Sequence, residues 1–348
     1  MSGAPPLIVS YSGVLGGAER VLLDCAARLD RGAVIACPDG PLAASLRAAG
    51  LEWAPVRERP LRRGVAHARG LAGLARDSAV LARRYRAGAI VAWGARAVLA
   101  TALLPARPRL LAVHHDLVPP GSPTLAAALR RATARSDGVA AASSAIAADV
   151  GAPGAVILHP GVDLRAFSPS PLPAGPPRAL MLGALVPWKR PDLALEVAAR
   201  VPDLQLELAG APLPGDGAGF ERSLRARAAA GGLAGRVTFA GRVSDPRAAL
   251  ARAHCLLHCA DAEPWGLALV EALAAGRPVV AADAAGPREI VGDGAGRLFP
   301  AGDAAAAAAA LEDVLADERA PAAARARAER FPVEASAARF AAAVAELA

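Results

Sequence analysis

Lysine and aromatic residues are the scarcest side chains in this sequence of 348 residues. Lysine occurs once, at Lys189, against 38 arginines, and aromatic residues make up 3% of the chain. The shortage of aromatic rings disfavours single-stranded nucleic acid as a partner, because bases bind by stacking on such rings. Because lysine and arginine differ in shape and hydration, the one lysine is a candidate site residue on composition alone.

Signatures of several protein classes are missing. The four cysteines suit a reducing compartment better than a disulfide framework. No charge-free apolar run reaches the roughly 18 residues of a membrane span, and the N-terminus lacks the regions of a signal peptide, so we expect a cytoplasmic protein. No Gly-x-Gly-x-x-Gly occurs, which disfavours a nicotinamide dehydrogenase. No Asp-x-Asp triplet occurs either, so no metal-held diphosphate is expected.

The length and the charge distribution predict two unlike domains. A chain of this length exceeds the ~250–300 residues at which a single core stops growing. The net charge is +7, and residues 1–170 hold 20 of the 39 basic residues but only 11 of the 32 acidic ones. Nine arginines fall between Arg57 and Arg86. This stretch could contact an anionic membrane at its inner face; the alternative is a solvated helix face, and nucleic acid is not an expected partner.

Short apolar strands alternate with helical segments along the chain. The expected strands cover residues 6–11, 33–37, 89–93 and 110–116, and then 178–182, 204–210, 237–241, 253–259 and 277–283. This alternation predicts an α/β fold with parallel sheets covered on both faces, whose ligands bind past the carboxyl ends of the strands. A proline-rich linker at 170–177 separates the predicted domains 1–170 and 178–332. Asp192 is expected to cap a helix over 192–200.

Residues 263–271, with the sequence Glu263-Pro-Trp-Gly-Leu-Ala-Leu-Val-Glu271, are the centre of the predicted site. They follow a buried strand and begin a helix near Gly266. The free N–H groups and the positive dipole end of that helix can hold a diphosphate. The spacing of Glu263 and Glu271 lets one carboxylate reach the far end of a bound ligand and the other its sugar-like hydroxyls.

Three further stretches place polar groups where strands end. Lys189 follows the strand 178–182 at the start of a helix, where an ammonium faces an anion. Gly16 and Gly17 open a helix and permit close backbone approach to a ligand. His114 and His115 end the strand that starts at 110; a histidine pKa lies near working pH, so such a ring can donate to a ligand hydroxyl or accept from one.

Histidine and cysteine also recur in His254-Cys255-x-x-His258-Cys259. A loop with this pattern could bind zinc. Here the pattern lies in a predicted strand, where neighbouring side chains point to opposite faces, so no metal site is expected.

Several of these motifs together resemble family 4 of the retaining, nucleotide-sugar-dependent glycosyltransferases. The Glu-x7-Glu pattern at 263–271 continues as Ala-Leu-Ala-Ala-Gly-Arg-Pro-Val-Val-Ala, and Gly286-Pro-Arg-Glu-Ile-Val291 follows. The Gly-Gly-x-Glu loop at 16–19, the His-Asp at 115–116, the Gly-Val-Asp-x-x-x-Phe-x-Pro at 161–169 and the Gly-Ala-Leu-Val-Pro-Trp-Lys-Arg at 183–190 also match. The resemblance implies a GT-B fold, in which two Rossmann-like domains face each other across a deep cleft and residues 333–348 pack back on the first domain.

The resemblance also implies roles for the candidate residues. The donor would be a UDP- or GDP-sugar, with no further cofactor, and the acceptor a glycan, a lipid-linked acceptor or a small molecule. The implied catalytic residues are His115, Lys189 and Glu263. The implied donor-binding residues are Gly17, Arg190, Arg242, Val243, Gly266, Leu267 and Glu271, and the acceptor side holds Gly16 and His114, the latter as a substitute for His115.

His159-Pro160 replaces the asparagine that the family has before Gly161, but one other departure from the family pattern matters more. Ala184 stands where the family has an arginine that holds the donor diphosphate, and Arg190 could supply the missing charge. This departure is the reason to keep a non-catalytic sugar-nucleotide-binding or scaffold protein of the same fold as an alternative. A phosphorylase of the same build is a further alternative, in which Lys189 would carry pyridoxal phosphate.

Overall fold

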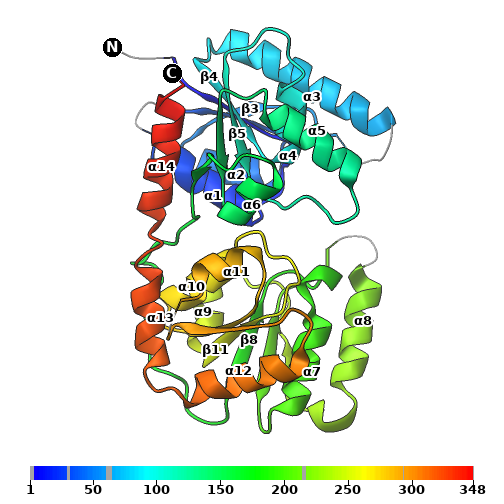
Figure 1. Cartoon of the computed structure of the whole chain (residues 1–348), viewed down its shortest axis with the longest axis vertical. Coiled ribbons are helices and arrows are strands. Elements are labelled where there is room, and N and C mark those ends of the chain that lie inside the picture. The colour runs from blue at the N-terminus through cyan, green and yellow to red at the C-terminus, as the bar shows by residue number, and fades with distance from the viewer. Residues whose placement is uncertain (1–3, 30–31, 60–64, 214–216, 293, 348) are drawn as a thin grey trace. The chain divides into compact units, whose positions relative to one another are not determined.

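The computed structural model describes residues 4–29, 32–59, 65–213, 217–292 and 294–347, and it divides into two compact units. Unit 1 comprises Met1–Gly161 and Val333–Ala348, and unit 2 comprises Val162–Pro332 (Figure 1). Each unit contains one parallel sheet with helices on both faces. Among the described residues, no helix is both long and apolar enough to cross a membrane.

Unit 1 is built on a seven-stranded sheet in the order β3-β2-β1-β4-β5-β6-β7, with neighbouring strands parallel. The strands are β1 (Leu7–Ser10), β2 (Val34–Cys37), β3 (Glu52–Pro55), β4 (Ala89–Trp93), β5 (Arg109–His114), β6 (Gly138–Ala141) and β7 (Val156–Ile157). The helices are α1 (Gly17–Ala26), α2 (Pro41–Ala48), α3 (Val65–Arg84), α4 (Ala95–Thr101), α5 (Pro123–Thr133), α6 (Ser144–Asp149) and α14 (Val333–Ala345).

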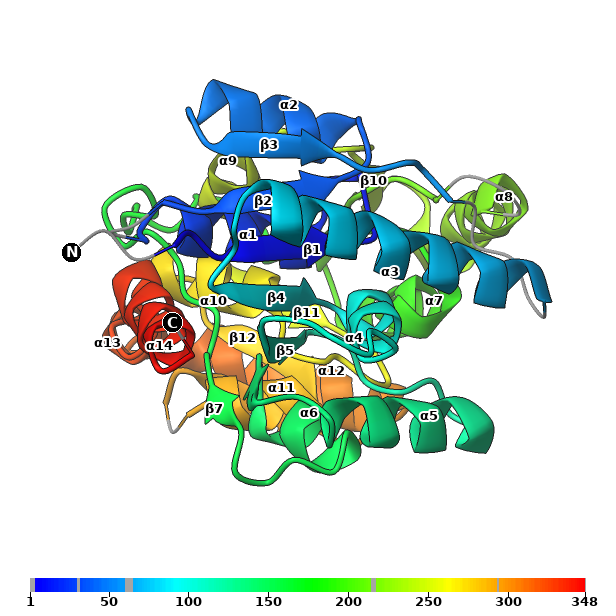
Figure 2. The ribbon, with the colours of Figure 1, turned by 90° about the horizontal axis from the view of Figure 1, so that it is seen from above.

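The two faces of this sheet are covered by different helices. A core cluster joins α3, α4 and α5 to one face, where Leu7, Ile90 and Leu110 are fully buried. Helix α14 packs on α1 on the other face, as Figures 1 and 2 show. Arg339 Nη1 donates to Leu158 O at 3.2 Å and Arg109 Nη1 to Glu346 O at 3.1 Å, so the last helix is tied to unit 1 by hydrogen bonds as well.

Unit 2 repeats the plan with six parallel strands in the order β10-β9-β8-β11-β12-β13. The strands are β8 (Arg178–Leu182), β9 (Gln205–Ala209), β10 (Val237–Phe239), β11 (Cys255–His258), β12 (Val279–Ala282) and β13 (Gly296–Phe299). The helices are η1 (Pro187–Lys189), α7 (Pro191–Arg200), α8 (Gly217–Ala228), η2 (Gly231–Leu233), α9 (Pro246–Ala251), α10 (Leu267–Ala274), α11 (Ala285–Ile290), α12 (Ala304–Ala316) and α13 (Ala320–Ala328).

Alternation along the strands of unit 2 sorts its side chains between the two faces. Leu257 and Cys259 belong to the core shared with α7, α8 and α12. Because successive side chains of a strand point to opposite faces, His258 points to the other face, where α9, α10 and α13 pack together. His258 therefore lies on the α10 side of the sheet, and Leu257 and Cys259 lie on the α7 side.

The domain boundary lies earlier than the proline-rich segment to which we assigned it. The chain divides between Gly161 and Val162 rather than within 170–177. The reason is a buried arginine, Arg277, which donates to Ser170 O at 2.9 Å and to Pro171 O at 3.0 Å. The guanidinium makes three hydrogen bonds to Ser170 and Pro171 and a fourth to Leu250 of α9, so the segment is part of unit 2 rather than a free linker.

The prediction that Asp192 caps a helix is wrong. Helix α7 begins at Pro191, and its N-cap is Arg190, which has φ +53° and ψ +49°. Asp192 lies inside the first turn and accepts from the Arg190 guanidinium instead. A proline favours the first helical position, so the helix starts one residue earlier than the cap pattern predicted.

Candidate functional site

The order of strands in unit 2 creates one point where the chain leaves the sheet in opposite directions. From β8 the chain continues to β9 on one side, and from β11 it continues to β12 on the other, while β8 and β11 are neighbours. Ligands of open α/β sheets bind outside the carboxyl ends of the strands at such a switch point. The segment after β8 carries Lys189 and the segment after β11 carries Glu263, so the topology brings these two predicted residues together.

Lys189 and Glu263 form an ion pair. Lys189 Nζ lies 2.7 Å from Glu263 Oε2, and His258 Nε2 lies 3.0 Å from the same oxygen. The side chains of the pair are only 17% and 10% exposed. Burial raises the pKa of Glu263, but the contact with His258 and the positive charge of Lys189 lower it more, so the pKa falls to about 2. Glu263 is therefore an anion throughout the working pH range.

The two oxygens of the Glu263 carboxylate differ in their surroundings. Oε2 accepts a hydrogen bond from Lys189 Nζ and lies 3.0 Å from His258 Nε2, whose geometry does not make a hydrogen bond. Among the described residues, Oε1 has no hydrogen-bond partner. It is also not one of the fully buried polar atoms without a partner, so part of its surface is accessible. One oxygen is thus anchored and the other remains able to accept a hydrogen bond from a ligand hydroxyl.

Helix α10 begins beside this pair. Its N-cap is Gly266 with φ +111°, and a Cβ at this position would lie 2.7 Å from Leu269 Cδ1 and 3.3 Å from Glu263 Cγ. Only glycine fits that backbone and that space. Because the turn is tight, only three residues separate Glu263 from Leu267, where the first helical turn and its free N–H groups begin. Glu271 lies one turn further along α10 and is 6% exposed.

Arg190 does not have the free guanidinium that we expected in place of the arginine missing at Ala184. Its Nε and Nη2 donate to Asp192 at 3.1–3.2 Å, and its Nη1 donates to Asp261 Oδ1 at 3.1 Å. Hydrogen bonding to Asp192 raises the pKa of the guanidinium further. Two carboxylates therefore hold the charge that a diphosphate would need.

Arg242 and Val243 lie in the loop after β10, close behind Gly241, which has φ +68°. Arg242 is exposed and Val243 half-buried. Their backbone groups lie past the carboxyl end of a strand, as the resemblance implies, and their role in reading a base stays a prediction.

In unit 1 the histidine pair at the end of β5 is divided between two environments. His114 Nε2 lies 3.1 Å from Thr133 Oγ1 of α5, which ties this ring into the α5 side of the sheet. His115 stacks on Trp93, with ring centroids 4.3 Å apart, and its buried Nε2 has no hydrogen-bond partner among the described residues. Of the two rings, His115 is the one with an uncommitted nitrogen.

The expectation that this histidine titrates near working pH is wrong. Burial lowers the pKa of His115 to about 3, with a smaller contribution from His114, whose own pKa burial lowers to about 4. Both rings are neutral at working pH. A neutral imidazole can still donate or accept one hydrogen bond, but it contributes no positive charge.

The glycine-rich turn of unit 1 leads into α1. Gly16 is the N-cap of this helix, and its N–H donates to Glu19 Oε2 at 3.0 Å, while Gly17 is exposed. Burial raises the pKa of Glu19 above its usual range. Neither glycine has a positive φ, so the backbone conformation does not require glycine here. Close approach of a ligand remains a reason for the two glycines.

Sequence reasoning missed one polar feature of unit 1. The Tyr11 hydroxyl is buried without a partner within the described residues, and the Arg96 guanidinium lies 5.4 Å from its ring centroid. Tyr11 follows β1 and Arg96 follows β4, which are neighbours in the sheet. The only signal in the sequence was the position of Tyr11 at the end of one predicted strand and of Arg96 shortly after another.

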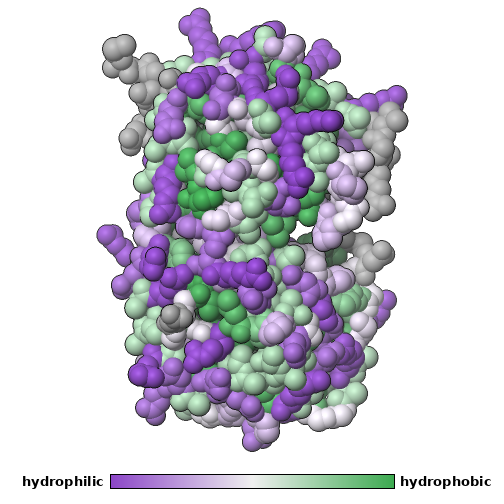
Figure 3. Space-filling view, in the orientation of Figure 1, coloured by the Kyte–Doolittle hydropathy of each residue, from purple (hydrophilic) through white to green (hydrophobic). Residues whose placement is uncertain are grey.

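The arginine-rich stretch is partly neutralised. Arg62 and Arg63 lie outside the described residues. Arg59 pairs with Asp77 of α3 at 2.5 Å. On the face shown in Figure 3, hydrophilic side chains are interspersed with hydrophobic ones over each unit instead of being segregated.

His254 and Cys255, at the start of the histidine- and cysteine-containing pattern, have structural surroundings. His254 Nδ1 accepts from the Arg178 N–H at 3.1 Å, and burial raises the pKa of the Cys255 thiol to about 12. Throughout the part of the chain that the structure describes, no group of three His, Cys, Asp or Glu side chains is arranged to hold a metal.

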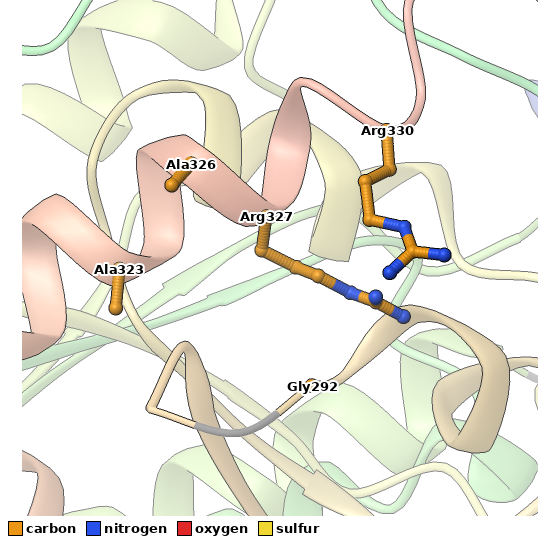
Figure 4. Close-up of a pocket in the computed structure, with 5 residues that line it drawn as sticks. All are labelled: Gly292, Ala323, Ala326, Arg327 and Arg330. Carbon is orange, nitrogen blue, oxygen red and sulfur yellow. The ribbon is translucent and has the colours of Figure 1, made fainter.

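A surface depression in unit 2 does not coincide with the site. It is lined by Gly292 and four residues of the α13 region, as Figure 4 shows, namely Ala323, Ala326, Arg327 and Arg330. Arg327 Nε donates to Ile290 O at 2.7 Å and packs against Gly292. This arginine fastens α13 to the end of α11, so the depression is a product of packing.

The strand order of the two units identifies the fold class of the protein. Two doubly wound units, each with its own switch point, form the GT-B class of α/β proteins, which confirms the predicted fold. HepE of Anabaena, solved in complex with UDP and glucose, is similar over 99% of this chain and 100% of its own, with a TM-score of 0.85 and 25% identity. A sucrose-phosphate synthase from Thermosynechococcus elongatus has the same fold, with a TM-score of 0.81 and 20% identity over 99% of each chain.

Residues 164–331 match the family model of the glycosyl transferases group 1. The match covers nearly all of unit 2, and the resemblance to family 4 glycosyltransferases is confirmed. A phosphatidyl-myo-inositol mannosyltransferase of Mycolicibacterium smegmatis is 38% identical over 178 residues, which is 47% of this chain and 44% of that protein. A D-inositol 3-phosphate glycosyltransferase of Mycobacterium sp. (strain KMS) is 37% identical over 136 residues, which is 36% of this chain and 31% of that protein. The chain thus spans less than half the length of these curated relatives.

Proposed function

We propose that this protein transfers a sugar from a nucleoside-diphosphate sugar to an acceptor, with retention of the anomeric configuration and without a bound metal. The single observation that carries the proposal is the Lys189–Glu263 ion pair at the β8–β11 switch point, next to the start of α10. A cation, an anion and free helix amides in one place match the two ends of a sugar diphosphate. The HepE structure, with UDP and glucose bound, supports the choice of donor class.

The reaction breaks the bond between the sugar C1 and the diphosphate. Negative charge then develops on the leaving diphosphate, and groups that are fixed before the reaction stabilise it best. Lys189 and the N–H groups that begin at Leu267 would supply this stabilisation. Glu263 Oε1 would accept a hydrogen bond from a sugar hydroxyl, and Glu271 would bind the ribose. Retention follows the family resemblance, in which the acceptor attacks the face that the diphosphate leaves and the diphosphate takes the acceptor proton.

His115 would bind the donor sugar as a neutral ring. Because burial holds its pKa at about 3, it can orient a hydroxyl but cannot act as a cation. The acceptor would be a glycan, a lipid-linked acceptor or a small molecule. The basic stretch from Arg57 to Arg86 favours an acceptor at an anionic membrane surface on the cytoplasmic side.

Donor binding and turnover test the proposal directly. Thermal shifts with UDP-, GDP- and ADP-sugars should identify one base, and release of that nucleoside diphosphate should follow on incubation with or without acceptors. E263Q and K189M should each lower the rate by on the order of 100-fold, since each removes a preorganised charge. Addition of EDTA should leave the rate unchanged. Wild-type protein that neither binds nor cleaves any member of the panel would exclude the proposal.

A second function, binding of a sugar nucleotide without turnover, is favoured by one observation. Ala184 removes one cation of the family pattern, and Arg190 is committed to Asp192 and Asp261. A protein of this kind would give a thermal shift with one sugar nucleotide but release no nucleoside diphosphate with any acceptor. The same panel therefore separates the two functions.

A further inference from the structure

Residues 188–190, which are the last two residues of η1 and its C-cap, contact the loop that follows β11. The Asp261 N–H donates to Trp188 O at 3.2 Å, Lys189 Nζ lies 2.7 Å from Glu263 Oε2, and Arg190 Nη1 donates to Asp261 Oδ1 at 3.1 Å. One backbone bond and two ion pairs thus join residues 188–190 to residues 261–263. We call these three contacts the seam. The seam crosses the switch point beyond the paired residues of β8 and β11, of which the last pair is Leu256 and Leu180.

Arg190 is held from both sides of this seam. Its Nε and Nη2 bind Asp192 in the first turn of α7, and its Nη1 binds Asp261 in the loop after β11. Its backbone has φ +53°, a conformation that suits glycine and disfavours side chains. Such strain persists where the surroundings determine the conformation more strongly than the residue itself does. The two carboxylates provide that determination.

We propose that Arg190 is a positioning residue that holds the Lys189 ammonium against Glu263 by clamping η1 to the loop after β11, and that it does not bind the donor diphosphate. Both sides of its guanidinium fork are already hydrogen bonded to carboxylates. Lys189 directly precedes it, so a fixed Arg190 fixes the direction in which the lysine leaves the chain. The inference rests on the proposed function for its activity measurement alone.

Removing either end of the clamp should have the same effect. R190G suits the backbone, so its melting temperature should lie within about 4 °C of wild type, whereas kcat should fall by about 10- to 100-fold because a misplaced group costs that much. The donor KM should change less than about threefold, because the lost side chain does not touch the donor. D261A should lower kcat to a similar extent, and R190G/D261A should be no worse than either single variant.

A matched control separates the clamp from the backbone effect. Asp203 is exposed and has φ +58° in the same unit. D203G relieves the same kind of backbone strain and should leave kcat unchanged. If Arg190 instead bound the diphosphate, R190G would raise the donor KM strongly, and D261A would leave activity unchanged or increase it by freeing the arginine. That pattern would overturn the proposal.

Hydrogen exchange tests the clamp without any substrate. The amides of Lys189 and Asp261, which donate to Val186 O and Trp188 O, should exchange faster in R190G and D261A than in wild type, and D203G should not change them. Equal protection in all four proteins would refute the clamp even if the enzyme transfers sugar. Lost protection in a protein that cleaves no sugar nucleotide would instead support the clamp and reject the proposed function.

Discussion

Replacement of Lys189 by methionine tests the charge arrangement of the site most directly. Methionine keeps much of the length and apolar surface of the lysine stem but removes the ammonium that lies 2.7 Å from Glu263. Among the described residues, His258 is then the remaining partner of this buried carboxylate. Its pKa should rise from about 2, because the burial that opposes ionisation remains while one of its partners is gone.

The magnitude follows from the pKa of Glu263. A carboxyl with a pKa of 4.5 in the unfolded chain and about 2 in the folded protein stabilises the folded state by ~3 kcal/mol at neutral pH. Because the folded pKa is depressed, this stabilisation is complete above about pH 4.5 and is lost as the pH falls from there towards 2. K189M should therefore destabilise unit 2 by about 2–4 kcal/mol at pH 7 and by less than about 1.5 kcal/mol at pH 3.

Urea unfolding of wild type and K189M between pH 7 and pH 3 measures this difference. Hydrogen exchange of peptides from β8 and β11 assigns the transition to unit 2, since the two units can unfold separately. E263Q is the matched control, because a neutral glutamine should remove the pH dependence itself. A stability difference between wild type and K189M that is the same at pH 7 and pH 3 would refute the electrostatic reasoning.

Three further predictions concern other parts of the fold. G266A should lower the free energy of unfolding by about 1–3 kcal/mol, because its Cβ would lie 2.7 Å from a leucine side chain. G50A is the control, since Gly50 has φ +69° with no atom within 4 Å of a Cβ, and it should cost only about 1 kcal/mol. Equal melting temperatures of the two variants would contradict this reasoning. His115 should show no NMR titration between pH 5 and 8, since its pKa is about 3, so a midpoint near 6.5 would show that the ring is not buried. R277M should lower the free energy of unfolding by about 2–4 kcal/mol, because it loses the hydrogen bonds to Leu250, Ser170 and Pro171. Limited proteolysis should then cleave the variant near residues 170–177. A cleavage rate equal to that of wild type would contradict the role of this arginine.

Much of the fold could be predicted from the sequence because it depends on local patterns. The strands β8 and β11 are continuous apolar runs, and Gly266 marks the start of α10 because only glycine fits its backbone. The helix start at Pro191 was missed because a left-handed Arg190 is an improbable N-cap. Its conformation depends on Asp261, which is 71 residues away in the sequence, and no local pattern reports such a contact.

The candidate site could be predicted as a set of residues but not as a network. Lys189 and Glu263 were selected separately, and their contact follows from the adjacency of β8 and β11, which a sequence pattern does not specify. The pKa of His115 was mispredicted for a related reason. The position at a strand end was correct, but the shift depends on how completely the ring is buried against Trp93.

The ion pairs of Lys189 and Arg190 determine how the site can bind an anion. Lys189 faces Glu263, and Arg190 faces Asp192 and Asp261, so the cations nearest the switch point are already balanced by carboxylates. A diphosphate would therefore gain little from net charge and more from directed donors, namely the remaining N–H bonds of the lysine and the amides at the start of α10. Binding that depends on directed donors weakens less with added salt than binding to a basic surface does. A shallow salt dependence of donor affinity, between about 50 and 500 mM NaCl, is accordingly the outcome that this balance of charges requires.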